Sequence, residues 1–227
     1  MRLPAPAVLP ALLTAALWPA APALAHPHAW IEMKSDVVFD DSGRVSALNI
    51  EWKFDADYSA MAIDGLDTNK DGFYSAGELQ PLAKENIEAL KEYGYFVYAK
   101  ADGKQVPYGE ITEYGQVYNN GILEMHFVLP LAGPVDPRKA AFAYQMYDPT
   151  FYIAMDYKDA TSVATVGAMP PECKIHLKPT PSDEQTEATR QMLAGKDQNW
   201  TPPEGEDFGS LFAQPVAVEC GKKAAAK

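Results

Sequence analysis

Alternation of apolar and polar side chains predicts β-strands over much of the chain. Residues 45–54 show the pattern most clearly, because every second position is apolar: Leu48, Ile50, Trp52 and Phe54. A period of two places one set of side chains in the core and the other toward solvent. Residues 29–39 have the same character, and the turn signal at residues 40–43 predicts that the two strands form a hairpin.

Short strand patterns return after residue 94 at regular spacing. They cover residues 95–101, 105–108, 112–118, 122–129, 140–146, 151–157, 173–177 and 216–220. Helical periodicity predicts helices at 57–63 and 79–93, on either side of residues 67–78, and a C-terminal helix that begins near Ser182 and ends at Gly195. Pro81 predicts either a kink or a new helix with Pro81 in its first turn.

These elements predict an α+β fold class. We expect residues 26–220 to form a single domain, an antiparallel β-sandwich. A helical insert at about residues 57–93 should lie between its second and third strands.

Residues 67–78 match the EF-hand calcium loop at every specified position. Ca²⁺ takes six to eight oxygen ligands, and the loop offers them from Asp67, Asn69, Asp71, the Phe73 carbonyl, Ser75 and Glu78. Gly72 permits the sharp turn after the third ligand. The sequence contains no second such loop, so we expect a weak dissociation constant of about 10⁻⁴–10⁻³ M. A polar surface turn without calcium is the alternative interpretation.

The first 25 residues have the composition of a secretory signal peptide. Arg2 gives a basic start, a Leu- and Ala-rich stretch follows, and Ala23-Leu24-Ala25 supplies small residues before a cleavage site. The apolar stretch is short and broken by prolines, which favours a signal over a membrane anchor. We therefore expect a periplasmic protein that begins at His26, does not insert into the membrane, and ends in a disordered tail at residues 221–227.

The net charge indicates which classes of partner fit this protein, and the two cysteines indicate a disulfide. The chain has 31 acidic and 19 basic side chains, for a net charge of −12. Such an acidic surface argues against nucleic acid and anionic lipid, and it attracts cations. In an oxidising compartment the two cysteines, Cys173 and Cys220, are expected to form a disulfide, with metal ligation as the alternative.

Two of the four histidines, His26 and His28, begin the predicted mature chain. The α-amine and ring of His26 and the imidazole of His28 can bind a transition metal such as Zn²⁺, Ni²⁺ or Cu²⁺. Glu124 and His126 share one face of a strand, and we expect them to complete a tetrahedral site, with His176 as an alternative ligand. A solvated terminus and a hydrogen-bonded sheet histidine are the alternatives.

Several segments carry a family resemblance: His26-Pro27-His28-Ala29-Trp30, the aromatic strand that ends at Phe54, Gly65-Leu66-Asp67, residues 95–100, Tyr147-Asp148-Pro149-Thr150-Phe151, and Phe212-Ala213-Gln214-Pro215-Val216 with Cys220. They resemble a family of uncharacterised bacterial periplasmic proteins labelled as the periplasmic component of an ABC-type transport system. Members of that family are encoded beside nickel/cobalt-type permeases, and some are linked to zinc uptake. The resemblance implies an accessory protein that delivers Zn²⁺, Ni²⁺, Co²⁺ or Cu²⁺ to an inner-membrane permease.

Three classes of function are compatible with these observations. The leading hypothesis is a metal-handling binding protein in which Ca²⁺ holds the insert in shape. The second is a calcium-stabilised adaptor with no transition-metal role, and the third is a copper oxygenase with a terminal-histidine site. The sequence has no Gly-x-Ser-x-Gly, His-Glu-x-x-His or phosphate-loop motif, which favours a binding protein over an enzyme.

Overall fold

The computed structural model describes residues 27–196, 200, 202–203 and 205–221. The predicted signal peptide, His26 and residues 222–227 of the predicted tail lie outside this part of the chain. Within the described residues, no helix combines the length and the apolar character needed to cross a membrane.

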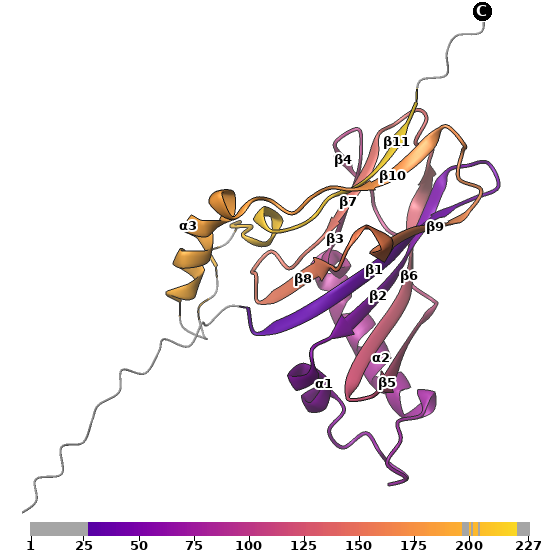
Figure 1. Cartoon of the computed structure of the whole chain (residues 1–227). Coiled ribbons are helices and arrows are strands. Elements are labelled where there is room, and N and C mark those ends of the chain that lie inside the picture. The colour runs from indigo at the N-terminus through magenta and orange to yellow at the C-terminus, as the bar shows by residue number, and fades with distance from the viewer. Residues whose placement is uncertain (1–26, 197–199, 201, 204, 222–227) are drawn as a thin grey trace, which may run out of the picture.

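Two sheets and a few helices make up a mixed α+β structure (Figure 1). The strands of the first sheet are β1 (Ala29–Phe39), β2 (Val45–Phe54), β5 (Tyr114–Asn119), β6 (Ile122–Val135), β8 (Ile153–Tyr157) and β9 (Val163–Gly167). Those of the second are β3 (Val97–Ala101), β4 (Lys104–Gln105), β7 (Phe142–Met146), β10 (Cys173–Leu177) and β11 (Val216–Cys220). The first sheet has the order β5-β6-β2-β1-β8, with β9 also paired to β1, and the second has the order β10-β11-β7-β3-β4.

The predicted β1–β2 hairpin is confirmed, and its register places Ile31 opposite Phe54. The antiparallel pairing expected of the sandwich is confirmed for most strand pairs, but β8 and β9 both pair with β1 in parallel. Strand β9 was not predicted. Its residues are mostly exposed, so it has no apolar face to give a sequence signal, and backbone pairing with the second half of β1 defines it.

Three buried hydroxyl groups connect the two sheets. The Ser35 Oγ atom on β1 lies 2.6 Å from the Tyr144 hydroxyl on β7 and 2.9 Å from the Tyr157 hydroxyl on β8. Burial raises the pKa of Tyr144 to about 12, so its hydroxyl stays protonated in neutral solution. Because Ser35 is 2 % exposed, these groups have each other as partners where water is excluded.

The helical insert lies between β2 and β3, as predicted, and consists of α1 (Ala56–Ala62), α2 (Ala76–Leu90) and the 3₁₀ segment η1 (Lys91–Phe96). The Leu123 N–H of β6 donates a hydrogen bond of 2.9 Å to Ser59 Oγ, which anchors α1. Helix α2 packs beside β5. The alternative in which a new helix starts at Pro81 is wrong, since α2 begins at Ala76 with a capping box formed by Ser75 and Glu78.

The C-terminal part adds α3 (Asp183–Ala194), the 3₁₀ turn η3 (Gly209–Leu211) and β11, while the 3₁₀ turn η2 (Ala160–Ser162) precedes β9. The predicted disulfide is confirmed. Cys173 and Cys220 are direct cross-strand neighbours on β10 and β11, so the bond ties the last strand to the second sheet. In Figure 1 these two strands lie at the opposite end of the molecule from α1.

We expect Ser35→Ala to lower the free energy of unfolding by about 1–3 kcal/mol, because two buried tyrosine hydroxyls lose a partner. Ser46→Ala is the matched control, since Ser46 makes one long hydrogen bond of 3.3 Å to the Val38 carbonyl at a half-buried position. Urea unfolding of the two variants and the wild type measures both changes. Equal stability losses in the two variants would contradict the role of the hydroxyl cluster.

Candidate functional site

The loop at residues 67–78 is closed by hydrogen bonds from its backbone to its own side chains. The Asp67 carboxylate accepts from the N–H groups of Asp71, at 3.2 Å, and Gly72, at 3.0 Å. Asn69 Oδ1 accepts from the Asp71 N–H at 2.9 Å. Lys70 has a φ of 61° and Gly72 a φ of 81°. These left-handed residues turn the chain so that the oxygen side chains of the first half of the loop converge.

Glu78 connects the two halves of the loop. Its Oε1 atom accepts from the Thr68 N–H at 3.0 Å and the Thr68 hydroxyl at 2.9 Å. Its Oε2 atom accepts from the Ser75 N–H at 3.0 Å and the Ser75 hydroxyl at 2.8 Å. These hydrogen bonds, first those from Ser75 and then that from Thr68, lower the pKa of Glu78 from 4.5 to about 2.

The loop contacts strand β5 through an aromatic pair. The Tyr74 ring, at position 8 of the loop, contacts the Tyr118 ring edge-on with 5.0 Å between ring centroids. In a paired EF-hand this position faces a second loop. Here the neighbour is a strand of the first sheet, which gives the single loop a rigid support.

All the atoms that the motif offers to a metal ion are oxygens, and Ca²⁺ prefers oxygen ligands. However, no group of three or more His, Cys, Asp or Glu side chains is placed to hold a metal ion within the described residues. The Glu78 carboxylate accepts hydrogen bonds from Thr68 and Ser75. Its bonds with Ser75 form the capping box of α2. The donor chemistry is therefore present, and calcium binding stays a prediction.

The described half of the predicted N-terminal histidine pair is fixed at a strand edge. The His28 N–H donates a hydrogen bond of 2.8 Å to the Tyr152 carbonyl. The two rings stack, with centroids 4.5 Å apart and planes inclined by 12°. The imidazole is solvent-exposed, and it lies two residues after the predicted terminus. His26 lies outside the described part of the chain.

Glu124 and His126 both lie on the outer face of β6, as their spacing predicted. His126 is opposite Glu51 on β2, which is opposite Lys34 on β1. His28 precedes Lys34 by six residues, so it lies ~20 Å from this row along the strand direction.

His176 is on β10 in the second sheet, where its Nε2 lies 3.6 Å from Glu219. The described residues therefore do not bring His28 together with the other three predicted ligands, Glu124, His126 and His176.

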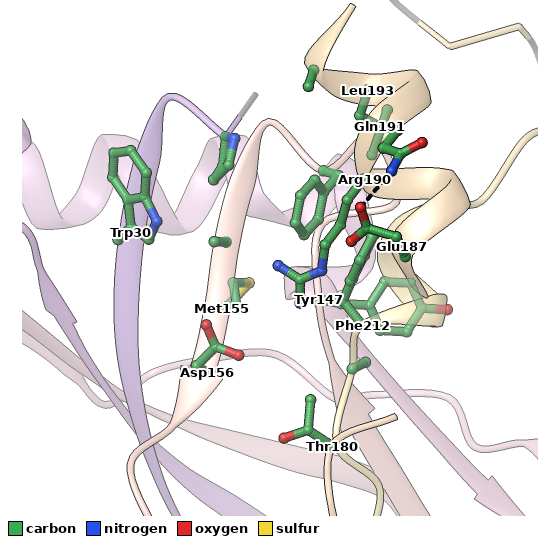
Figure 2. A pocket seen from close by; sticks show the side chains of 16 residues that line it. Trp30, Tyr147, Met155, Asp156, Thr180, Glu187, Arg190, Gln191, Leu193 and Phe212 are labelled. Carbon is green, nitrogen blue, oxygen red and sulfur yellow. Dashed lines mark hydrogen bonds between the residues drawn. The ribbon is translucent and has the colours of Figure 1, made fainter. Parts of the chain in front are cut away.

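A cavity of about 420 Å³ lies between β8, helix α3 and the segment that contains η3 (Figure 2). We call it the α3 cavity. Its walls are mostly apolar, and its charged side chains come from β8 and α3: Asp156, Glu187 and Arg190. No local sequence pattern predicted these charged residues as a group, because only the fold brings β8 and α3 to the same cavity.

The turn at residues 147–151 shapes one wall of the α3 cavity. Asp148 is 4 % exposed, and its carboxylate accepts hydrogen bonds from the N–H groups of Thr150, Tyr152 and Ile153. This cap holds Phe151 at a φ of 56°, a left-handed conformation that is uncommon for a bulky residue.

The C-terminal segment closes against this turn. The Phe151 ring stacks on Phe212 with 4.2 Å between centroids. Gly209 is required here, because a Cβ atom would overlap the Asp148 carbonyl oxygen. The Tyr147 hydroxyl donates a hydrogen bond of 2.9 Å to Asp207. Three segments that carried the family resemblance line the cavity, through Pro27 and Trp30, Tyr147 and Phe151, and Phe212 and Ala213.

Comparison with known proteins gives a family match over most of the chain. The profile of a family described as "Protein of unknown function (DUF1007)" matches residues 11–220. An uncharacterised protein of Haemophilus influenzae is 26 % identical over 199 residues, which cover 87 % of this chain and 92 % of that protein. An uncharacterised 15.5 kDa protein encoded in the trpE 3′ region of Spirochaeta aurantia is 27 % identical over 116 residues, or 51 % of this chain and 82 % of that protein.

The lowered pKa of Glu78 predicts a pH dependence of stability. A carboxylate whose pKa falls from 4.5 to about 2 on folding stabilises the folded state above pH 4.5, and this contribution is lost as the pH falls toward 2. We expect thermal unfolding midpoints between pH 5 and pH 2 to fall less steeply in Glu78→Gln than in the wild type. Glu85→Gln, an exposed change on the same helix, should retain the wild-type slope; equal slopes in all three proteins would contradict the assignment.

Proposed function

We propose a function from the premise that this chain belongs to the DUF1007 family of proteins of unknown function. In this proposal, the protein is an exported metal-handling accessory protein. Ca²⁺ bound by residues 67–78 holds the helical insert in shape, and a transition metal bound at the N-terminal histidines is delivered to a membrane permease. The Cys173–Cys220 disulfide supports the periplasm as the compartment, because such bonds persist in oxidising environments.

The observation that carries the calcium proposal is the closure of the loop by its own oxygen side chains. Asp67 accepts from the Gly72 N–H across the sharp turn, and Glu78 reaches back to Thr68 near the start of the loop. Positions 1 and 12 of the motif are thus already directed inward. On Ca²⁺ binding, the Glu78 carboxylate would exchange its bonds to Thr68 and Ser75 for the ion, and this exchange supports a weak affinity of about 10⁻⁴–10⁻³ M.

The rigid placement of His28 supports the transition-metal proposal. Its backbone is paired with Tyr152 and its ring is stacked there, so little conformational entropy is lost when the imidazole binds a metal. Along the strand direction, Glu124 lies ~13 Å and His126 ~20 Å from His28. The proposed donors are therefore the α-amine and imidazole of His26 and the imidazole of His28. A site with three nitrogen donors keeps open coordination positions, which suits a protein that passes its metal on.

A calcium-stabilised adaptor is the second candidate. It is favoured by the separation of His28 from His126, which removes the strand residues from the predicted four-ligand site. The adaptor would bind Ca²⁺ in the same loop and no transition metal. The two candidates therefore differ only in the behaviour of the N-terminus.

We expect Ca²⁺ to raise the thermal unfolding midpoint of the mature chain, and Glu78→Gln to remove most of this shift because bidentate closure is lost. Free Ca²⁺ at ten times its dissociation constant adds about 1.4 kcal/mol of stability, which corresponds to roughly 3–6 °C in a domain of this size. Melting curves with Ca²⁺ and with a chelator measure the shift. Glu85→Gln should keep it, and an equal shift in Glu78→Gln would contradict calcium binding by the loop.

We expect the chain that begins at His26 to bind one equivalent of Zn²⁺, Ni²⁺ or Cu²⁺, and His28→Ala to weaken binding by about tenfold or more, as loss of a ligand should cost at least as much as loss of a supporting group. His126→Ala is the matched control and should bind like the wild type. Calorimetric titration with each metal measures both. No effect of His28→Ala would favour the adaptor, and an equal loss in His126→Ala would restore the four-ligand site.

A further inference from the structure

The α3 cavity has an apolar interior and a charged edge. Its apolar lining includes Trp30 of β1, Ala154 and Met155 of β8, and the rings of Phe151 and Phe212. Phe151, Met155 and Phe212 are at least half-buried, while Trp30 is 53 % exposed at the mouth. An interior of this kind and size is typical of a site for a small ligand with an apolar part.

Two opposite charges face this interior. Figure 2 shows the Arg190 side chain extending from α3 toward Met155 and Asp156 on β8. The guanidinium carbon lies 5.1 Å from the centre of the Phe212 ring, and Arg190 Nε donates to the Thr186 hydroxyl at 3.3 Å. These contacts fix the stem of the side chain and direct its two terminal nitrogen atoms to the cavity.

Arg190 and Asp156 influence each other without forming an ion pair. The positive charge of Arg190 lowers the pKa of Asp156, while burial, the larger effect, raises it. Within the described part of the chain, neither group makes an ion pair closer than 4 Å. Glu187, the other lining carboxylate, lies on α3 itself and accepts a hydrogen bond from Gln191. Asp156 is the lining carboxylate on β8, toward which the Arg190 side chain extends.

Charge complementarity selects the class of ligand. A ligand with only a carboxylate would satisfy Arg190 and place a like charge beside Asp156. A ligand with only an ammonium group would satisfy Asp156 and place a like charge beside Arg190. Like charges in a partly desolvated site cost more than in water, so a ligand that carries both charges fits better than either.

We propose that the α3 cavity binds a small zwitterion with an apolar side chain, such as a free apolar α-amino acid. Arg190 receives the carboxylate in a charge-assisted hydrogen bond, and Asp156 receives the ammonium group. The apolar side chain lies between Met155, Phe151 and Trp30. This site goes beyond the proposed metal functions and uses none of the metal-binding residues.

The turn geometry supports a preformed site. Asp148 fixes Phe151 in its left-handed conformation through hydrogen bonds to the following N–H groups. Backbone strain of this kind persists only where the surrounding structure enforces it. The Phe151 ring is thereby held against Phe212, directly beside the Arg190 guanidinium.

The test is calorimetric titration of the folded chain with three probes of one size: L-phenylalanine, 3-phenylpropionate and 2-phenylethylamine. L-Phenylalanine has both charges, and each of the others lacks one. We expect saturable binding of L-phenylalanine and about tenfold weaker binding of each single-charge probe, since each loses one charge-assisted interaction. Equal or tighter binding of either single-charge probe, or no binding of L-phenylalanine, overturns the proposal.

Two variants assign the roles. Arg190→Gln is expected to weaken the binding of L-phenylalanine about tenfold or more and not to weaken the binding of 2-phenylethylamine. Asp156→Asn should weaken the binding of L-phenylalanine by a similar factor and should not weaken the binding of 3-phenylpropionate. Arg44→Gln, at an arginine in the distant β1–β2 turn, is the matched control and should bind L-phenylalanine like the wild type. Thermal unfolding of each variant verifies folding, and unchanged affinity in folded Arg190→Gln overturns the assignment.

Discussion

The cluster of Ser35, Tyr144 and Tyr157 fixes how the two sheets meet. Apolar contacts between sheets are non-directional, whereas buried hydroxyl groups must find partners at hydrogen-bond distance. Strands β7 and β8 lie in different sheets, and each contributes a tyrosine whose hydroxyl is hydrogen-bonded to the same serine on β1. The turn at residues 147–151 connects these two strands, so its position, and that of Phe151 within it, follows from the cluster.

The helical insert depends on the first sheet in the same way. Ser59 ties α1 to the start of β6, and Tyr74 rests on Tyr118 of β5. A single EF-hand-type loop lacks the partner loop that usually orders it. Here strand β5 and the capping box of α2, in which Glu78 takes part, supply that order. The Glu78 carboxylate is shared between helix capping and proposed calcium closure, which explains physically why affinity should be low.

The segment around His28 and the α3 cavity are neighbours in the fold but separate in chemistry. Pro27 lines the cavity, and His28 is stacked on Tyr152 just after the turn. The proposed metal donors are nitrogen atoms at and before His28, whereas the proposed ligand contacts are the charges of Asp156 and Arg190. Loss of one function by substitution should therefore leave the other measurable.

The sequence by itself determined the elements whose signals are local. Alternation in β1 and β2 gave their bounds and pairing, and the cysteine pair gave the disulfide. The spacing of oxygen side chains predicted the loop at residues 67–78. The strand and loop signals depend on neighbours within about a dozen positions, whereas the disulfide, which spans 47 residues, followed from there being two cysteines in the chain.

Tertiary structure decided the rest. Strand β9 is mostly exposed and has no periodicity, and the parallel pairing of β1 with β8 and β9 joins segments more than 100 residues apart. The same holds for the sites. His28 and His126 share no row of the sheet, although their residue types suit one metal. Arg190 and Asp156 are unremarkable in the sequence, and they line the same cavity only because the fold brings α3 and β8 to it.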